Sequence, residues 1–347
     1  MRQTSLLLWV VFIVFVLSIV ACSSSGSGNS DGSGGTTATT ITTTTSTSLT
    51  STSITTSTTN TTTTTIKAPW TQKTDFGGTP RWFAAGFSIG SRGYIGMGSN
   101  NATHNKDLWE YNPATNSWTQ KSDFKGSVGD GGVGFSIESK GYFKVNYSSE
   151  FWEYSPNTNN WTQKADFFGD ITANPVGFSI GSKGYMGTGY SLSSYSKEFW
   201  EYNPNTDTWT QKADFGGTAR ISATGFSISS KGYIGMGVDS YNDVRDFWEY
   251  NPAADSWTQK SDFGGKAGGY AIGLSINNKG YLLSGGFPEE FWEYNPATDS
   301  WIKKTALDET WRMGAAGFSI QNKGYIGTGN NNSEMKNDFW AYDPSLE

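Results

Sequence analysis

The sequence Phe-Trp-Glu-Tyr-Asn-Pro at residues 199–204 is followed at residues 209–215 by Trp-Thr-Gln-Lys-Ala-Asp-Phe, and both phrases recur along the chain. Copies of the second phrase, the last of them degenerate, begin at Trp70, Trp118, Trp161, Trp209, Trp257 and Trp301. These copies lie 43–48 residues apart. A period of this length is typical of a protein built from repeated supersecondary units.

Each unit contains four short apolar runs separated by turn residues. Between two Trp phrases the chain reads Gly-Phe-Ser-Ile or a relative, a Lys-Gly or Arg-Gly turn, Tyr-Ile-Gly-Met-Gly or a relative, and Phe-Trp-Glu-Tyr-Asn-Pro or a relative. Runs rich in aromatic and β-branched residues between Gly and Asn-Pro turns predict β-strands. We therefore expect four antiparallel strands, a to d, in every unit.

Two further features recur from unit to unit. A glycine closes strand b in five units, and it forms the doublet Gly285-Gly286 in the fifth unit. Five Tyr–Trp pairs keep a spacing of seven residues: Tyr111–Trp118, Tyr154–Trp161, Tyr202–Trp209, Tyr250–Trp257 and Tyr294–Trp301. This combination resembles the kelch repeat, which has a diglycine after its second strand and a Tyr-Asp-Pro turn leading to a Trp in its fourth. The resemblance implies one propeller blade per unit, with a local departure in the second unit at Val145-Asn146.

The strand count predicts how the ring closes. Strands a to c occur six times, and no fourth strand follows the last set, which ends at residues 339–344. A spare strand d, from Trp70 to Phe76, precedes the first unit. We expect it to pair with the last unit and leave no free edge. The predicted fold class is all-β, a six-bladed β-propeller over residues 67–347 with the last blade closed by the N-terminal strand d.

Residues 1–21 have the features of a cleavable signal peptide. Arg2 precedes an apolar run of 16 residues from Leu6 to Ala21, short of the ~20 that span a bilayer. The run ends at Cys22, the only cysteine, in a sequence that resembles the lipobox of bacterial lipoproteins. The resemblance implies cleavage before Cys22, a lipid on its thiol and, with Ser23 next, an outer-membrane location in the bacterial cell envelope. An unmodified cysteine in an uncleaved anchor is the alternative.

Residues 22–66 lack the composition of a folded domain. Of the 30 residues from Thr36 to Thr65, 25 are Ser or Thr. Such a segment buries too little apolar surface to offset the entropy lost on ordering. We expect a disordered tether that starts at the lipidated Cys22 and holds the propeller away from a membrane.

Composition excludes several classes of function. The net charge is −6, so the chain lacks the basic footprint of a nucleic-acid-binding protein. It has one His and one Cys, which excludes a Cys/His zinc site and a Cys nucleophile in the folded domain. We expect no metal and no cofactor. Twelve of the 15 Trp stand at repeated strand positions, so most of them pack between blades rather than bind a ligand.

Comparison of the six units locates the variable face. The a–b and c–d turns are nearly constant, whereas the b–c and d–a connections vary, and strand alternation places the latter two on one face, here called the loop face. The b–c loops contain 8, 3, 8, 8, 4 and 8 residues, and the short ones belong to the opposite units 2 and 5. The d–a loops of these two units are rich in glycine. We expect a groove across the axis over blades 2 and 5.

The expected groove walls carry polar and aromatic candidates. An arginine stands five residues before the strand-a Gly in units 1, 4 and 6: Arg81, Arg220 and Arg312. The folded-domain Trp outside the repeat pattern are Trp82 and Trp311, in neighbouring units 1 and 6. The arginines and tryptophans could clamp an anion or stack on a sugar, or they could only hold loops together. Further candidates lie in the b–c loops: Asn101, His104, Tyr195, Tyr241, Asp243, Arg245 and Asn331.

Three functions remain open. We favour a monomeric, membrane-anchored binding module that recognises an extended glycan or protein segment on the loop face, and not an enzyme. The alternative is a sugar-active enzyme, because some bacterial kelch proteins resemble sialic-acid mutarotases; Asp130 or Glu309 would then supply a carboxylate. A copper-dependent galactose oxidase is excluded, since its site uses two His and a Cys-linked Tyr. The third possibility is a scaffold in an envelope assembly.

Overall fold

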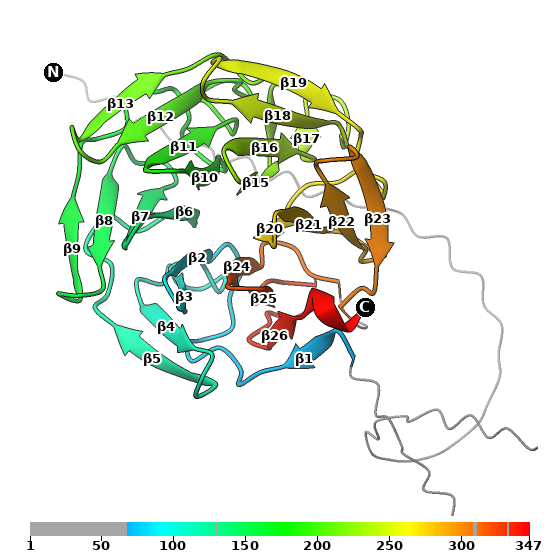
Figure 1. The fold of residues 1–347 in the computed structure, drawn as a ribbon. Helices are drawn as coiled ribbons and strands as arrows, with labels where there is room; N and C mark the ends of the chain where they lie inside the picture. Colours follow the sequence, from blue (N-terminus) through cyan, green and yellow to red (C-terminus); the bar gives the residue numbers. More distant parts are fainter. Residues whose placement is uncertain (1–67, 130, 308–310, 332) are drawn as a thin grey trace, which may run out of the picture. The chain divides into compact units, whose positions relative to one another are not determined.

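The computed structural model describes residues 68–129, 131–307, 311–331 and 333–347. They form six four-stranded antiparallel sheets in a ring around a central axis (Figure 1). This is the six-bladed β-propeller that the repeats predict. The expected signal peptide, Cys22 and the tether lie outside the described residues. Within these residues no helix is long and apolar enough to span a membrane.

In each blade strand a lies at the axis and strand d at the rim (Figure 1). Blades 1 and 2 contain β2 (Ala85–Ile89), β3 (Arg92–Gly96), β4 (Leu108–Asn112), β5 (Ser117–Lys121), β6 (Gly132–Ile137), β7 (Lys140–Val145), β8 (Phe151–Ser155) and β9 (Asn160–Gln163). Blades 3 and 4 contain β10 (Val176–Ile180), β11 (Lys183–Gly187), β12 (Phe199–Asn203), β13 (Thr208–Gln211), β15 (Thr224–Ile228), β16 (Lys231–Gly235), β18 (Phe247–Asn251) and β19 (Ser256–Lys260). Blade 5 contains β20 (Ile272–Ile276), β21 (Lys279–Leu283), β22 (Phe291–Asn295) and β23 (Ser300–Lys304).

Blade 6 joins the two ends of the described chain, as the strand count predicts. Its first three strands are β24 (Ala316–Ile320), β25 (Lys323–Gly327) and β26 (Phe339–Tyr342), and its fourth is β1 (Trp70–Gln72). β1 pairs antiparallel with β26, so that Trp70 lies opposite Tyr342 and Gln72 opposite Trp340. A single turn of 3₁₀ helix, η1 (Pro344–Leu346), follows β26.

The repeated Phe and Gly fit one another between blades. A Cβ atom on Gly93, at the start of strand b in blade 1, would lie 2.1 Å from the ring of Phe318 in strand a of blade 6. The same clash would occur at Gly141 with Phe87 of the preceding blade. Any larger residue at these glycines would displace the aromatic ring. The spacing of Phe and Gly in each unit is therefore set by how one blade packs on the next.

Strand a divides its side chains between the core and an axial channel. In β2 the side chains of Phe87 and Ile89 are buried, whereas Gly86 and Ser88 are partly exposed. The same alternation occurs in the other five inner strands, so that small residues surround the axis. Cavities of about 240 and 370 Å³ follow the axis between rings of Ala, Gly and Ser. The channel is lined by uncharged residues along its described length.

The four long b–c loops fold back on themselves. In blades 1, 3, 4 and 6 each of these loops first pairs with the preceding d–a loop: Trp82 with Ser99, Ala173 with Tyr190, β14 (Arg220–Ile221) with β17 (Val238–Asp239), and Met313 with Asn330. Each loop then forms a bridge within itself: Ser99 with His104, Tyr190 with Tyr195, Val238 with Asp243, and Asn330 with Met335. In the described parts of blades 2 and 5 no such bridges form. The short b–c loops of blades 2 and 5 thus lack the second layer of pairing that the four long loops have.

Candidate functional site

Arg81 is completely buried beneath the loop face. Its guanidinium donates to both carboxylate oxygens of Asp107 at 2.6 and 2.9 Å, to the Met97 carbonyl and to two oxygens of Thr79. It also lies 5.0 Å from the ring centre of Phe76. The side chain thus ties the d–a loop to the start of strand c.

Arg220 repeats this arrangement with Asp246. Arg312 makes the same paired bonds to Asp338, but its buried Nε has no partner among the described residues. Burial opposes ionisation of Asp246, but the hydrogen bonds and positive charge of Arg220 outweigh it and lower the pKa of the carboxyl. Arg312 has the same effect on the pKa of Asp338. This geometry favours the loop-holding alternative for all three arginines over direct contact with a ligand.

Units without the arginine hold the same loop differently. The acidic residue that opens strand c is Glu there instead of Asp: Glu150, Glu198 and Glu290. The longer side chain reaches the d–a loop and accepts hydrogen bonds from the backbone N–H of Ser127, Asp170 and Lys266. In the sequence, units with the arginine have Asp before strand c, and units without the arginine have Glu there. This correlation could have shown that the arginines hold the d–a loop.

A ring of six equivalent residues forms the mouth of the axial channel on the loop face. Each stands three residues before the strand-a Gly, and each has a positive φ between 51° and 74°: Phe83, Gly131, Asn174, Ser222, Tyr270 and Gly314. Backbone hydrogen bonds join parts of this ring, including Phe83 N–H to the Gly314 carbonyl and Tyr270 N–H to the Ser222 carbonyl. These bonds connect the mouth across neighbouring blades of the closed propeller. None of the motifs in the sequence indicated it.

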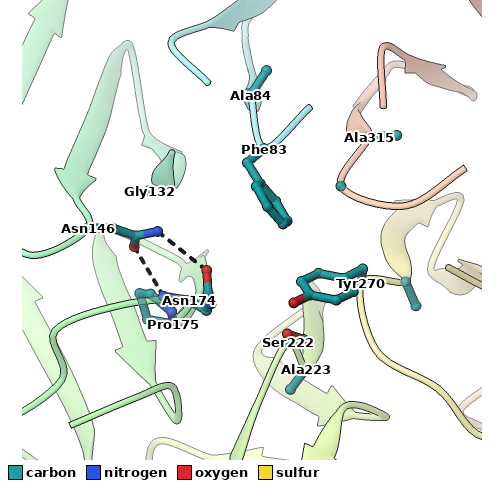
Figure 2. A pocket seen from close by; sticks show the side chains of 12 residues that line it. Phe83, Ala84, Gly132, Asn146, Asn174, Pro175, Ser222, Ala223, Tyr270 and Ala315 are labelled. Carbon is teal, nitrogen blue, oxygen red and sulfur yellow. Dashed lines mark hydrogen bonds between the residues drawn. The ribbon is translucent and has the colours of Figure 1, made fainter. Parts of the chain in front are cut away.

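One side of the mouth is aromatic. Figure 2 shows Phe83 pointing inward toward Tyr270, and their ring centres are 5.3 Å apart. Phe83 lies against Gly314, where a Cβ atom would come within 2.9 Å of the Phe83 ring. Trp82 stacks on Phe83 at 4.5 Å. Trp82 thus supports the mouth through Phe83, and its described ring contacts do not include Trp311.

The other side of the mouth presents amides. The Asn146 side chain accepts a hydrogen bond from the backbone N–H of Asn174 and donates one to the Asn174 side-chain oxygen (Figure 2). Asn146 stands where the other units have the strand-b glycine. This departure from the repeat therefore has a structural consequence at the mouth, which the sequence alone did not indicate.

The mouth encloses a cavity of about 150 Å³. The twelve described residues that line it are all uncharged: Phe83, Ala84, Gly132, Asn146, Asn174, Pro175, Ser222, Ala223, Tyr270, Ala271, Gly314 and Ala315. This volume holds several water molecules. The Oγ of Ser222 is buried at this site and has no hydrogen-bond partner among the described residues.

A second cavity, of about 230 Å³, lies over blade 5. Tyr270 lines both cavities, and the second continues along Lys266–Gly269 to Gly285, Gly286 and Pro288. The glycine-rich d–a loop and the short b–c loop therefore make the depression expected over this blade. Asp243 lines its blade-4 side.

Exposed apolar side chains also occur in the connections that form the loop face. They belong to b–c and d–a connections of blades 2 to 5: Val128, Tyr147, Phe168, Tyr190, Leu192, Tyr241 and Phe287. Tyr241 is 89% exposed and Phe287 is 71% exposed. A rim of this kind offers contact area to a ligand longer than the mouth itself.

The remaining candidates are spread around the rim. His104, Tyr241, Asp243, Arg245 and Asn101 are exposed. Arg245 lies 3.9 Å from Asp262, and the ring of Tyr195 packs edge-on against Tyr190. Trp311 and Asn331 are half-buried. The structure does not gather these residues into one cluster, and Asp130 and Glu309 lie outside the described residues. Among the described residues there is no group of three or more His, Cys, Asp or Glu that could hold a metal ion.

Comparison with known proteins supports the fold alone. No protein-family model matches the chain, and no curated protein matches its sequence significantly. The solved structure of YjhT superposes on this chain with a TM-score of 0.65 at 14% identity. The match covers 78% of this chain and 95% of the other. The chain is thus a six-bladed β-propeller similar in fold to YjhT.

Proposed function

We propose that this protein is a binding module whose ligand site is the loop face. The observation that carries the proposal is the mouth cavity, where otherwise repetitive units place different aromatic, amide and hydroxyl side chains around one space. Loops supported by a rigid scaffold are where binding sites usually lie. Concave sites lined by apolar rings and a few placed polar groups are typical of ligand pockets.

The ligand is an extended glycan or protein segment. The second cavity leads away from the mouth over blade 5, and both cavities share Tyr270. Exposed rim residues such as Tyr241 and Phe287 add apolar surface along this path. An extended ligand could therefore place one end at the mouth and its remainder across blade 5.

The repeats belong to the kelch type, and the propeller is held at a membrane by a lipid on Cys22. The motifs that support this proposal are the strand-b glycines, the Tyr–Trp spacing and the apolar run ending at Cys22. Substitution Cys22→Ala is expected to release the protein from membranes. If the variant still partitions with membranes after a high-salt wash, the lipoprotein proposal fails.

Glycan and peptide arrays test the binding proposal. The full chain is expected to bind at least one oligosaccharide or peptide, and Tyr270→Ala is expected to abolish that binding. Asn205→Ala, in an exposed c–d turn on the opposite face, serves as the matched control and is expected to bind normally. The proposal fails if the full chain binds nothing on either array, or if the two variants bind equally well.

The alternative is a sugar-active enzyme of the kelch mutarotase type. It rests on the resemblance of the repeats, whereas the described residues that line the mouth are uncharged and supply no acid–base pair. An assay of anomer interconversion on free sugars distinguishes the two functions. Catalysis that is lost in Tyr270→Ala would favour the enzyme.

A further inference from the structure

We infer that the mouth cavity holds one neutral sugar residue, which enters the axial channel end-on from the loop face. The inference rests on the proposed function and names the ligand chemistry of its central pocket. It combines three observations on the described residues: two aromatic residues in a costly backbone conformation, three hydrogen-bonding groups without partners among them, and a lining in which they carry no charge.

The aromatic residues are placed at a cost to the fold. Phe83 has φ 52° and Tyr270 has φ 60°, in the left-handed region that bulky residues rarely adopt. Glycine occupies the equivalent positions 131 and 314. The backbone of the mouth therefore forms without a side chain, and the two rings are not needed to build it. Strained residues that the fold does not require are characteristic of ligand sites.

Three polar groups around the cavity have no partner among the described residues. They come from three consecutive blades and are the Oγ of Ser222, which is buried, and the Tyr270 hydroxyl and Asn174 Nδ2, which belong to half-buried residues. Ser222 is only 6% exposed. A buried polar atom without a hydrogen bond is destabilising, so a ligand that supplies a bond to the Ser222 Oγ gains the difference.

The arrangement of these groups favours a sugar over a peptide side chain. The hydroxyl and amide groups follow an arc around the cavity, opposite the Phe83 ring (Figure 2). A pyranose carries hydroxyls around its ring and an apolar C–H face, which suits such an arc beside an aromatic face. A neutral peptide side chain carries polar atoms at one end only. A charged sugar would lose hydration without meeting an opposite charge among the described lining residues.

Calorimetric titration of the full chain tests the inference. The probes are the methyl glycosides of glucose, galactose, mannose and N-acetylglucosamine, with methyl glucuronide as the charged probe. Oligosaccharides and peptides from the arrays are titrated in parallel. At least one neutral glycoside is expected to bind at least tenfold more tightly than the glucuronide.

Two variants remove single hydroxyl groups from the mouth. Ser222→Ala and Tyr270→Phe are each expected to weaken binding of that glycoside at least fivefold. Neither hydroxyl bonds to a described residue, so neither variant is expected to lower the melting temperature, and Ser222→Ala removes a buried group without a partner. Ser193→Ala, an exposed serine of a b–c loop on the same face, is the matched control and is expected to bind like the unmodified protein.

The outcomes separate this inference from the broader proposal. If glycoside binding is unchanged in Ser222→Ala and Tyr270→Phe, or if the glucuronide binds as tightly, the inference is overturned. If peptides bind on the loop face but no glycoside binds, the inference fails and the binding module stands. If no glycoside, oligosaccharide or peptide binds, both fail.

Discussion

The indole nitrogen of Trp70 donates a hydrogen bond of 2.8 Å to the carbonyl of Thr305, although the two residues are 235 positions apart. Each of the other five strand-d tryptophans donates the same bond to the preceding blade: Trp118 to Thr74, Trp161 to Ser122, Trp209 to Ala165, Trp257 to Ala213 and Trp301 to Ser261. The bond from Trp70 closes the series. The ring is therefore joined at the chain ends as it is between other blades.

Glu347 completes the same junction. In blade 5 the c–d turn residue Asp299 accepts a hydrogen bond from Ser261 N–H of the preceding blade. Blade 6 has no c–d turn, and Glu347 accepts the equivalent bond from Thr305 N–H at 2.7 Å. It also pairs with Lys304 at 3.0 Å. A side chain thus substitutes for a turn where β26 and β1 come from opposite ends.

Trp70→Ala is expected to lower the free energy of unfolding by about 3–5 kcal/mol, the usual cost of removing a buried tryptophan. Trp70 is 8% exposed and packs on Phe291 and Tyr342. Trp161→Ala, in blade 2, is the matched control and is expected to cost about the same. Chemical denaturation measures both. A Trp70 variant as stable as the unmodified protein would mean that β1 does not close the ring.

Arg220→Ala is expected to destabilise the fold by about 3–5 kcal/mol, because it leaves the half-buried Asp246 without its partner. The folded-state pKa of Asp246 lies below its usual range. Stability from the pair is therefore present above pH ~4 and is lost as the pH falls through the folded-state pKa. Denaturation curves from pH 2 to 7 should show a smaller acid loss in the variant. Ligand affinity that falls while stability is unchanged would instead place Arg220 in the binding site.

Glu289 is expected to make the protein less stable as the pH rises, which is opposite to the effect of the Arg220–Asp246 pair. Burial raises its pKa to about 8, and the nearby Arg312 opposes this only in part. Between the ordinary Glu pKa of ~4.3 and pH 8 the folded state binds the extra proton, so stability falls as pH rises, by at most about 1.4 kcal/mol per unit. Glu289→Gln should flatten that slope and raise stability at pH 8. An identical slope in the variant would show that Glu289 is ionised in the folded protein.

The fold could be predicted because its determinants are local and repeated. The Phe87–Gly141 contact recurs between neighbouring blades, so its sequence signature recurs at a fixed spacing. The closure by Trp70 followed from the count of strands. The contribution of Glu347 could not be predicted, because its only sequence signal is one acidic residue outside the repeat.

The mouth could not be predicted because its residues come from six separate segments. Phe83 and Tyr270 meet only when the ring has closed, and neither belongs to a conspicuous motif. Aligning the six units at the position three residues before the strand-a Gly would have shown that this position varies. The arginines were conspicuous for a different reason: their charge suggested a ligand, whereas Arg81 is fully used by bonds within the protein.

Trp82→Ala is expected to weaken ligand binding about threefold to tenfold, since an aromatic stacking contact stabilises by about 0.5–1.5 kcal/mol. Trp82 stacks on Phe83 and so holds that ring at the mouth. Trp311→Ala is expected to have a smaller effect: neither Trp lines the two cavities, but only Trp82 of the two has a described ring contact with a lining residue, Phe83. Titration of both variants with the tightest oligosaccharide or peptide from the arrays measures the difference. A larger loss at Trp311 would place the ligand over blade 6.

Hydrogen–deuterium exchange of the full chain, with and without that ligand at saturation, tests most directly whether the loop face is the binding surface. The account predicts slower exchange at residues 83–84, 146–147, 172–174, 222–223 and 268–271, which surround the mouth and the start of the blade-5 cavity. Exchange in the c–d turns, such as residues 204–207, should not change. Slower exchange confined to those turns, or no change at the mouth when the ligand is bound, would contradict the account.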